Sequence, residues 1–169
     1  MTALKARQTP SFITRAFRDA LGCFATGVTI ITTVAPDGRL LGVTINSFNS
    51  LSLEPPLVLF SLARSLMSFN GFEGARHFAV NVLGRHQKIL ANHFATRTIN
   101  KFANLEFVTG ETGCPLIPGA VVYFECETRA RYDGGDHMIF VGEVLRLEAD
   151  IEAEPLVYHR GRFHSLLGD

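Results

Sequence analysis

The segment "RARYDGGDHMIFVGEV", Arg129 to Val144, predicts two β-strands joined by a tight turn. Its second half is rich in Ile, Phe and Val, which favour strands, and the glycines at 134 and 135 suit a short hairpin turn. A histidine, His137, stands beside Asp136 where the second strand begins. From these residues alone it can be a plain turn residue, a catalytic base, a metal ligand or a contact for a substrate.

Strand-like segments follow one another along the rest of the chain at short spacing. The clearest is the hairpin at 27–45, where Val, Ile and Thr fill both arms and Pro36-Asp37-Gly38 supplies the turn. Further strands are expected at 55–62, 77–83, 120–132, 137–150 and 155–166. Because hairpins, and not crossover helices, join most of these strands, the pattern favours a mainly β fold with flanking helices, built as an antiparallel barrel.

A helix is expected near the N-terminus, at 11–26, because apolar residues recur there at helical spacing behind Pro10. These residues are Phe12, Ala16, Phe17, Ala20, Leu21 and Phe24. The segments 65–74 and 85–96 have room for short helices. With no internal repeat and no credible boundary, residues 1–169 are expected to form a single domain, of which residues 1–10 are a flexible N-terminal segment.

Composition narrows the class of protein. The chain has 169 residues with 16 Lys plus Arg and 16 Asp plus Glu, so its formal net charge is zero, which argues against a nucleic-acid binder. The sequence has no run of about 18 apolar residues, so no membrane-spanning helix is predicted. The N-terminus lacks the apolar core of a signal peptide, so a cytoplasmic protein with no membrane partner is expected. The three cysteines are far apart and predict reduced thiols.

The sequence lacks several familiar catalytic motifs. It has no GxGxxG after a strand, no P-loop, no GxSxG, no HExxH and no CxxC. His86 and His93 are seven residues apart, a spacing that would align them on one helix face. Since no third ligand follows at a useful spacing, a solvated helix face is a better interpretation than a metal site.

Small polar residues replace the strand pattern at 46–52. Asn46, Ser47 and their neighbours can hydrogen-bond a planar heteroaromatic ring, although a plain polar loop is the simpler alternative. A second polar segment, 61–68, is expected at the start of a helix. Its hydroxyls and guanidinium come from Ser61, Arg64, Ser65 and Ser68. Exposed amides, the helix dipole and an arginine there predict a phosphate site, with ordinary helix capping as the alternative.

Several separated motifs together resemble the short-chain flavin reductase family, the small reductase partners of two-component aromatic monooxygenases. They are "FATGVTIITT" at 24–33, "GVTINSFNSLSLEPPLVLFSLARSLMS" at 42–68, "FAVNVLGRHQKILANHFA" at 78–95, "KF" at 101–102, "GDHMIFVGEV" at 135–144 and "PLVYHRGRF" at 155–163. The resemblance covers about residues 15–167. It implies a flavin-binding antiparallel split β-barrel and a homodimeric NAD(P)H:flavin oxidoreductase.

The resemblance also implies which residues meet the cofactors. The segments that would hold FAD or FMN contain Thr44, Ile45, Asn46, Ser47, Ser61, Leu62, Ala63, Arg64, Ser65, Ser68, Asn92 and Phe94. Those that would meet NADH or NADPH contain Gly135, Asp136 and His137, with Tyr158 a weaker match. His137 would position the nicotinamide, and no residue is expected to act as an acid or base because the cofactors carry the hydride chemistry. Phe163 departs from the family, in which Tyr is frequent.

The implied product is reduced flavin, which would diffuse to a partner oxygenase, one acting on aromatic compounds. Fourteen Phe and no Trp indicate either an aromatic core or an aromatic subunit interface. Two alternatives stay open: a flavin-binding protein for storage or sensing, and an oxidase of a pyridoxine phosphate, for which the chain lacks basic residues around a second phosphate. The remaining candidates, His159, His164, Arg129 and Arg131, are expected on the surface.

Overall fold

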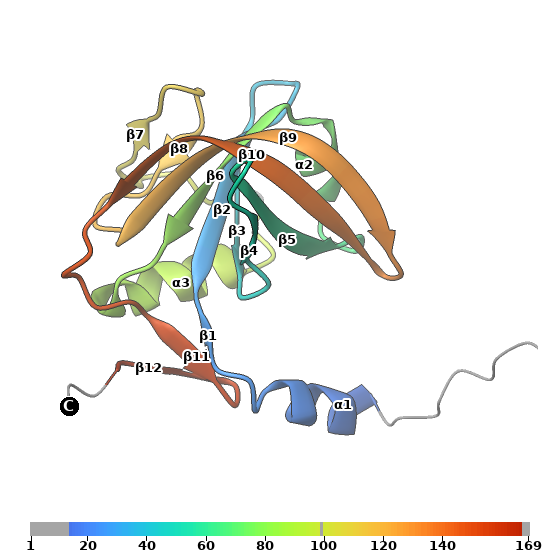
Figure 1. Ribbon diagram of the computed structural model, residues 1–169, viewed down its shortest axis with the longest axis vertical. Coiled ribbons are helices and arrows are strands. Elements are labelled where there is room, and N and C mark those ends of the chain that lie inside the picture. The colour runs from blue at the N-terminus through green and yellow to red at the C-terminus, as the bar shows by residue number, and fades with distance from the viewer. Residues whose placement is uncertain (1–13, 99, 167–169) are drawn as a thin grey trace, which may run out of the picture.

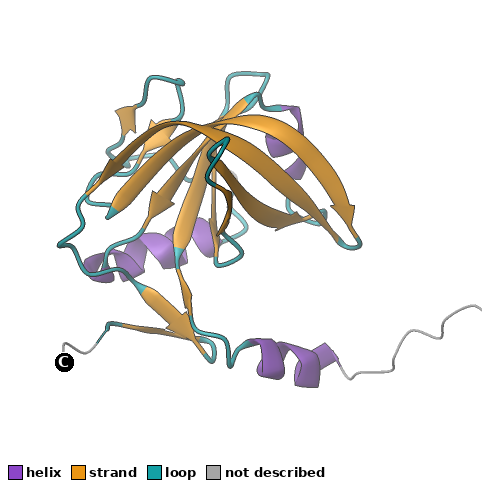
Figure 2. Cartoon of the chain, in the orientation of Figure 1, coloured by secondary structure: helices purple, strands orange, loops and turns teal. Residues whose placement is uncertain are grey.

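The computed structural model describes residues 14–98 and 100–166 and shows a strongly curved sheet with short helices beside it (Figures 1 and 2). Seven strands form this sheet in the order β3-β2-β6-β9-β10-β5-β4, and every neighbouring pair is antiparallel. They are β2 (Thr29–Val34), β3 (Leu40–Ile45), β4 (Asn49–Ser52), β5 (Leu57–Ala63), β6 (His77–Val82), β9 (Val122–Gly134) and β10 (His137–Ala149). The prediction of a mainly β, antiparallel fold is confirmed.

The hairpin of β9 and β10 is the longest element of the sheet and arches over it in Figure 1. Its turn places Gly135 in the left-handed region, at φ 77°, where glycine is favoured. The register shifts between Val141 and Gly142 and again between Val144 and Arg146. Such irregularities bend a strand, which lets one long hairpin follow a curved wall. The predicted hairpin is confirmed and extends beyond 129–144 at both ends.

The two edge strands of the sheet, β3 and β4, are consecutive in the chain. Only the segment 46–48 separates them, so the sheet must curl until its edges approach each other there. The edges are joined by this link and not by a hydrogen-bonded ladder, which leaves a seam in the barrel. Residues 49–52, expected to continue a polar loop, form β4 and pair with β5 from Asn49 to Ser52.

Four helical segments and two small sheets complete the described chain. The helices are α1 (Thr14–Leu21), α2 (Phe69–Gly74), the 3-10 helix η1 (Arg85–Gln87) and α3 (Lys88–Ala95). One small sheet contains β1 (Thr26–Gly27), β11 (Val157–His159) and β12 (Arg162–His164), and the other contains β7 (Val108–Thr109) and β8 (Pro115–Leu116). β1 pairs with β11, so a segment near each end of the described chain meets the other below the main sheet in Figure 1.

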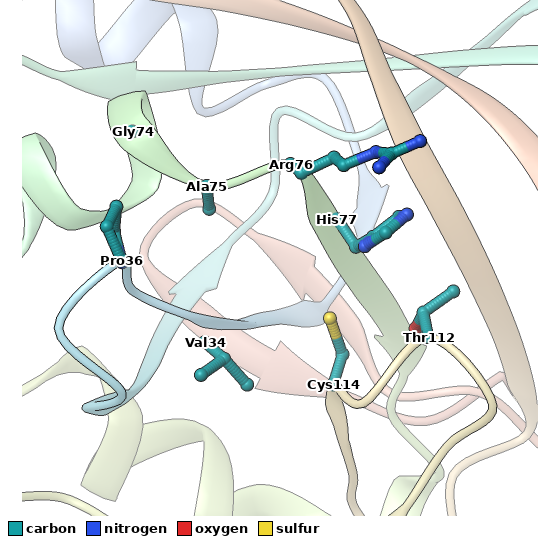
Figure 3. Close-up of a pocket in the computed structure, with 8 residues that line it drawn as sticks. All are labelled: Val34, Pro36, Gly74, Ala75, Arg76, His77, Thr112 and Cys114. Atoms are coloured by element: carbon teal, nitrogen blue, oxygen red, sulfur yellow. The ribbon is translucent and has the colours of Figure 1, made fainter.

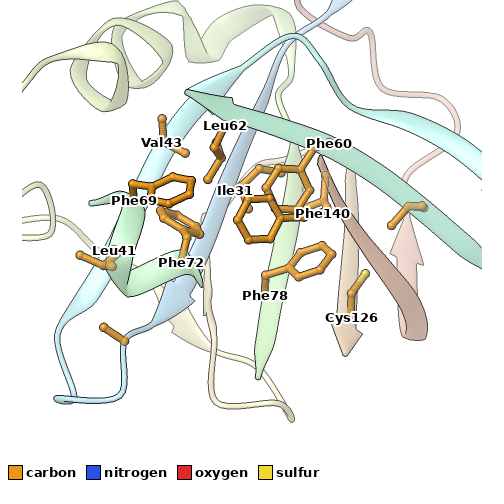
Figure 4. Close-up of a cluster of buried hydrophobic side chains, with 13 residues drawn as sticks. Ile31, Leu41, Val43, Phe60, Leu62, Phe69, Phe72, Phe78, Cys126 and Phe140 are labelled. Atoms are coloured by element: carbon orange, nitrogen blue, oxygen red, sulfur yellow. The ribbon is translucent and has the colours of Figure 1, made fainter. Parts of the chain in front are cut away.

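Apolar side chains pack on both faces of the main sheet. On the α2 side, the rings of Phe60 and Phe140 stack with centroids 5.0 Å apart, and Phe78 meets Phe60 edge-on at 4.9 Å (Figure 4). Consecutive residues of β2 divide between the faces: Ile31 belongs to this cluster and Ile30 to a second one that includes Phe94 of α3. Alternation along a strand explains the division. Much of the Phe content therefore lies in the core.

The main sheet also buries a polar side chain. Asn81 of β6, which alternates with apolar residues, is fully buried. Its amide nitrogen donates to the Ile30 carbonyl (2.9 Å) and to the Thr32 hydroxyl (3.2 Å), and its oxygen accepts from the Ile117 amide (2.8 Å). A buried amide with every partner satisfied ties three segments together without the cost of an unpaired polar group.

Two helix predictions differ from the structure. The segment 61–68 was expected at the start of a helix and also overlapped the strand expected at 55–62; Ser61 to Ala63 lie in β5, as the strand prediction had it for Ser61 and Leu62, and α2 begins only at Phe69. The strand continues because Leu62 fits the core, where it is 1% exposed. The N-terminal helix is confirmed over Thr14–Leu21, yet Leu21 is 58% and Phe24 76% exposed, so its apolar side is not covered by the described part of this chain. Phe12 and residues 1–10 lie outside the described residues, and the single domain stays a prediction.

Candidate functional site

The seam of the barrel carries the first group of predicted residues. The Ser47 hydroxyl donates to the Ser61 carbonyl (3.0 Å) and accepts from the Ser61 amide (3.1 Å), so the link after β3 is fastened to β5. The Thr44 hydroxyl donates to the carbonyl of Ala91 in α3 (2.7 Å). These contacts fix the position of a short polar segment between two strands and a helix, which is the preorganisation that a binding site needs.

The turn between β9 and β10 lies against the same end of β5. His137 pairs with Ala63 across the two strands, and the Arg64 amide donates to the Asp136 carbonyl (2.9 Å). The His137 ring donates through Nδ1 to the Asp136 carboxylate (2.7 Å), and this hydrogen bond, with the charge of the ring, lowers the pKa of Asp136. The two segments that the sequence assigned to different cofactors are therefore neighbours.

A hollow of about 430 Å³ opens between β3, the segment after β5 and the end of α3. We call it the α3 hollow. Four predicted flavin residues line it, namely Thr44, Ser65, Ser68 and Phe94. Three basic side chains line it as well, from Arg39, Arg97 and Lys101, and no carboxylate does. Arg39 already pairs with Asp37 (2.7 Å), so Arg97 and Lys101 are the cations that remain, with the hydroxyls, to bind a phosphate.

Lys101 is the most unusual of these cations because it is only 7% exposed. Its ammonium donates to the carbonyls of Gly42 (3.0 Å) and Phe94 (2.7 Å), and burial lowers its pKa. Its own carbonyl accepts from the His93 ring (2.7 Å). Lys101 thus joins β3 to the end of α3 at the wall of the α3 hollow.

A second hollow, of about 640 Å³, lies between α1, the segment just after β3 and the β11–β12 hairpin. We call it the α1 hollow. Asn46 and Tyr158, predicted for the flavin and the nicotinamide respectively, both line it. The Tyr158 ring rests against Phe163 with centroids 5.5 Å apart, so the position at which relatives often carry Tyr serves here to pack Tyr158.

Comparison with known proteins agrees with this geometry. A family described as "Flavin reductase like domain" matches residues 21–167. The chain belongs to the flavin reductase-like family. It is similar to the "FMN reductase (NADH) SmoA" of Agrobacterium fabrum, at 46% identity over 88% of this chain and 84% of the relative. It is also similar to the "Flavin-dependent monooxygenase, reductase subunit HsaB" of Rhodococcus jostii, at 39% identity over 92% and 79%.

The fold has a close structural counterpart. The NADH:FAD oxidoreductase SgcE6 of Streptomyces globisporus, solved in complex with NAD and FAD fragments, superposes with a TM-score of 0.89 at 36% identity, covering 97% of this chain and 99% of that one. The predicted antiparallel split barrel is confirmed. Two other curated relatives are longer, since this chain spans 48% and 44% of them.

Not every predicted residue of this family member reaches a hollow. The side chain of Leu62 is buried in the core, so it can contact a flavin only through its backbone. Asn92 is exposed on α3 and lines neither hollow. Arg64, predicted for the phosphate, already pairs with Asp133 (2.6 Å) and lies over the Phe69 ring at 5.7 Å. Its phosphate role stays a prediction.

The sequence reasoning missed Arg39, Arg97 and Lys101. The available signal was the short motif "KF" at 101–102, which belonged to the resemblance but was given no role. The cations and hydroxyls around the α3 hollow fit a phosphate-bearing group. The Phe94 ring is fully buried, so, like Leu62, it supports the site from within and does not offer its side chain to a flavin. That ring packs so closely on β3 that a Cβ at Gly42 would lie 2.4 Å from it. A glycine is therefore required to keep Phe94 in this wall.

Other candidates fall away from the site. The hollow in Figure 3, of about 260 Å³, lies near the turn of the β2–β3 hairpin and holds none of the predicted residues. Burial raises the pKa of Cys114 there, which makes it a poor nucleophile. The solvated helix face is right for His86, which is exposed, but wrong for the half-buried His93. Among residues 14–98 and 100–166, no group of three or more His, Cys, Asp or Glu could hold a metal ion.

Proposed function

We propose that this protein is an NADH-dependent flavin reductase that reduces FMN or FAD and supplies the reduced flavin to a separate monooxygenase. The observation that carries the proposal is the contact between the 135–137 turn and the end of β5, beside a hollow lined with hydroxyls and cations. The contact supports the proposal because it brings the segment that the resemblance assigns to the nicotinamide next to one that it assigns to the flavin. SmoA, HsaB and SgcE6 carry names of the same activity class.

The mechanism asks the chain for positioning and electrostatics. A bound flavin supplies the ring that accepts the hydride from the nicotinamide. The backbone amides of Thr44 to Ser47 would hydrogen-bond the edge of that ring at the seam, where the hydroxyls of Thr44 and Ser47 hold the segment in place, and Arg97 and Lys101, which line the α3 hollow, would hold its phosphate. Holding two flat rings face to face supplies much of the rate enhancement, and no protein acid or base is required.

His137 positions the nicotinamide in this scheme. Its Nδ1 is held by Asp136, which fixes the direction of the imidazole and leaves Nε2 for the carboxamide or a phosphate of the dinucleotide. Within the described chain, no residue hydrogen-bonds the Nε2 of His137. A protein that only stores or senses flavin would have no use for such a residue. The same barrel acting as a pure flavin-binding module therefore ranks second, behind the reductase.

A homodimer is part of the proposal. Apolar side chains are exposed beside the turn between β4 and β5: Leu53 is 89%, Leu145 52% and Leu147 61% exposed. The Val144 amide donates to the Pro56 carbonyl (2.9 Å), so these side chains gather at one end of β10. Burying such a patch against a second copy removes apolar area from water.

The partner and the compartment follow from the same chemistry. We expect reduced flavin released from the seam to diffuse to the oxygenase. The name of HsaB, the reductase subunit of a flavin-dependent monooxygenase, supports an oxygenase partner. The described helices include none that is long and apolar enough to cross a membrane. The three cysteines are free thiols, which supports a reducing compartment such as the cytoplasm.

The test is to mix purified protein with NADH and either FAD, FMN or riboflavin and to follow the absorbance of the nicotinamide. We expect flavin-dependent loss of NADH. If neither NADH nor NADPH is consumed while flavin still binds, the reductase proposal is wrong and the binding module replaces it.

A further inference from the structure

The lining of the α1 hollow contains two arginines that do not belong to the residues predicted for the flavin. Arg18 comes from α1 and Arg160 from the turn between β11 and β12, so the two ends of the described chain each contribute one guanidinium. The Arg160 amide donates to the Gly22 carbonyl (2.8 Å), and its guanidinium reaches the Cys23 sulfur at 3.9 Å. Arg160 has φ 48°, a left-handed conformation that an arginine adopts rarely. Tertiary contacts therefore hold this side chain at the hollow.

The charges of the hollow favour an anion. Arg18 and Arg160 supply two positive charges and Asp19 one negative charge to its lining, and none of the three forms an ion pair with another residue in the described ranges. Arginine presents a planar fork of donors that matches the oxygens of a phosphate. Two arginines without ion-pair partners at a concave surface are thus suited to bind a phosphate diester or a diphosphate.

One residue of the hollow acts on the 135–137 turn. The pKa of Asp136 is lowered first by the hydrogen bond from His137, and the charge of Arg18 makes the smallest contribution to the same shift, so Arg18 lies within electrostatic range of that turn. Asn46, predicted for the flavin, and Tyr158, predicted for the nicotinamide, line the hollow itself. At about 640 Å³, the hollow has the size of a small-molecule site and can take one half of a dinucleotide.

We infer that Arg18 and Arg160 bind the diphosphate of the nicotinamide dinucleotide while its ring lies toward His137 and the seam. The inference rests on the proposed function, because it assigns a residue pair to that reaction's co-substrate. The reaction brings two phosphate-bearing cofactors, and the proposed function assigns the α3 hollow to the flavin phosphate. The arginines of the α1 hollow suit the second cofactor because Tyr158, predicted for the nicotinamide, lies in the same lining.

The experiment compares Arg18→Met and Arg160→Asn with two matched controls. Asn is chosen at 160 because it tolerates the left-handed conformation. Arg15→Met lies on the same helix and Arg162→Met in the same hairpin, and neither side chain lines the hollow. Each variant is assayed with NADH and with reduced nicotinamide mononucleotide, which lacks the diphosphate bridge, at saturating FMN, and Arg160→Lys tests rescue by a retained charge.

We expect each test variant to raise the KM for NADH about tenfold with little change in kcat, because each loses a charged hydrogen bond to the dinucleotide. The KM for the mononucleotide and for FMN stays as in the parent protein, Arg160→Lys recovers part of the loss, and both controls are silent. An unchanged KM for NADH overturns the inference. A raised KM for FAD with an unchanged KM for NADH also overturns it, because the pair would then bind the adenylate of FAD.

Calorimetric binding of ADP-ribose separates this inference from the proposed function, because it needs no turnover. Binding by the parent protein that is weakened in Arg160→Asn supports the arginine pair even if no NADH is consumed. Absence of ADP-ribose binding in the parent protein overturns it even if NADH is consumed.

Discussion

The backbone amide of Arg64 donates a hydrogen bond to the carbonyl oxygen of Asp136 at 2.9 Å. These residues are far apart in the sequence, and the contact fastens the β9–β10 turn to the end of β5. The segment proposed for the nicotinamide is therefore carried by the same strand end as the segment proposed for the flavin, so backbone hydrogen bonds, and not mobile side chains, would set the geometry between the two cofactors.

His137→Ala tests the positioning role at this turn. We expect the KM for NADH to rise about tenfold, as for the loss of one polar contact to a ligand, while the Kd for FMN stays within about a factor of two. Steady-state kinetics and fluorescence titration of the flavin measure the two quantities. His164→Ala, an exposed histidine of β12, is the control. Lost flavin binding with an unchanged KM for NADH would mean that the turn is wrongly placed.

Arg97→Ala and Arg64→Ala together locate the flavin phosphate. Because Arg64 already pairs with Asp133 whereas Arg97 lines the α3 hollow, we expect the larger effect from Arg97→Ala. Its Kd should rise about tenfold for FMN and FAD and much less for riboflavin, which has no phosphate. Equal losses for all three flavins would refute a phosphate role, and a larger FMN-selective loss from Arg64→Ala would transfer the role to that residue.

Lys101→Met has a predicted pH signature. Burial lowers the pKa of Lys101 from its usual 10.5, so the folded state releases its proton before the unfolded state does. Between the folded pKa and about 10.5 the unfolded chain binds more protons, so stability from this group rises with pH. The free energy of unfolding of the parent protein, relative to that of Lys101→Met, should therefore increase as pH rises from 7 toward 10, as measured by urea titrations. Lys88→Met, an exposed lysine of α3, should show no such trend.

Gly42→Ala tests the wall of the α3 hollow. The added Cβ would lie 2.4 Å from the Phe94 ring, so the ring or the strand must shift. We expect a loss of about 1–3 kcal/mol in the free energy of unfolding, typical of an overpacked core, together with weaker FMN binding. Gly27→Ala is the control, because nothing lies within 4 Å of its Cβ. Unchanged stability in Gly42→Ala would show that Phe94 is not held as described.

Leu147→Glu tests the proposed homodimer. A charge in an exposed apolar patch costs little in a monomer but opposes its burial between two copies. We expect a shift from dimer to monomer in light scattering coupled to size-exclusion chromatography. Ile89→Glu, 82% exposed on α3 and away from the patch, should stay dimeric. A parent protein that is monomeric at micromolar concentration would remove the homodimer from the proposal.

Local patterns accounted for most of the strands. The hairpins at 27–45 and 129–144 were predictable because β-branched residues and turn glycines act over a few neighbours. The error at 61–68 arose because serines near a helix start look alike whether the helix begins at 61 or at 69. Burial of Leu62 decided the matter in favour of the strand. The importance of Lys101 was equally invisible, since its carbonyl partners are residues 42 and 94.

The sequence by itself determined the antiparallel class, the family and the segments proposed to meet the cofactors, because strand alternation and turn chemistry are local and the family motifs are contiguous. Only the tertiary structure decided which of those residues come together. The seam at 46–48, the α3 hollow with Lys101, and the α1 hollow with Arg18 and Arg160 all join segments that are distant in the chain. Their position depends on how the sheet curls and packs, and that is a property of the whole fold.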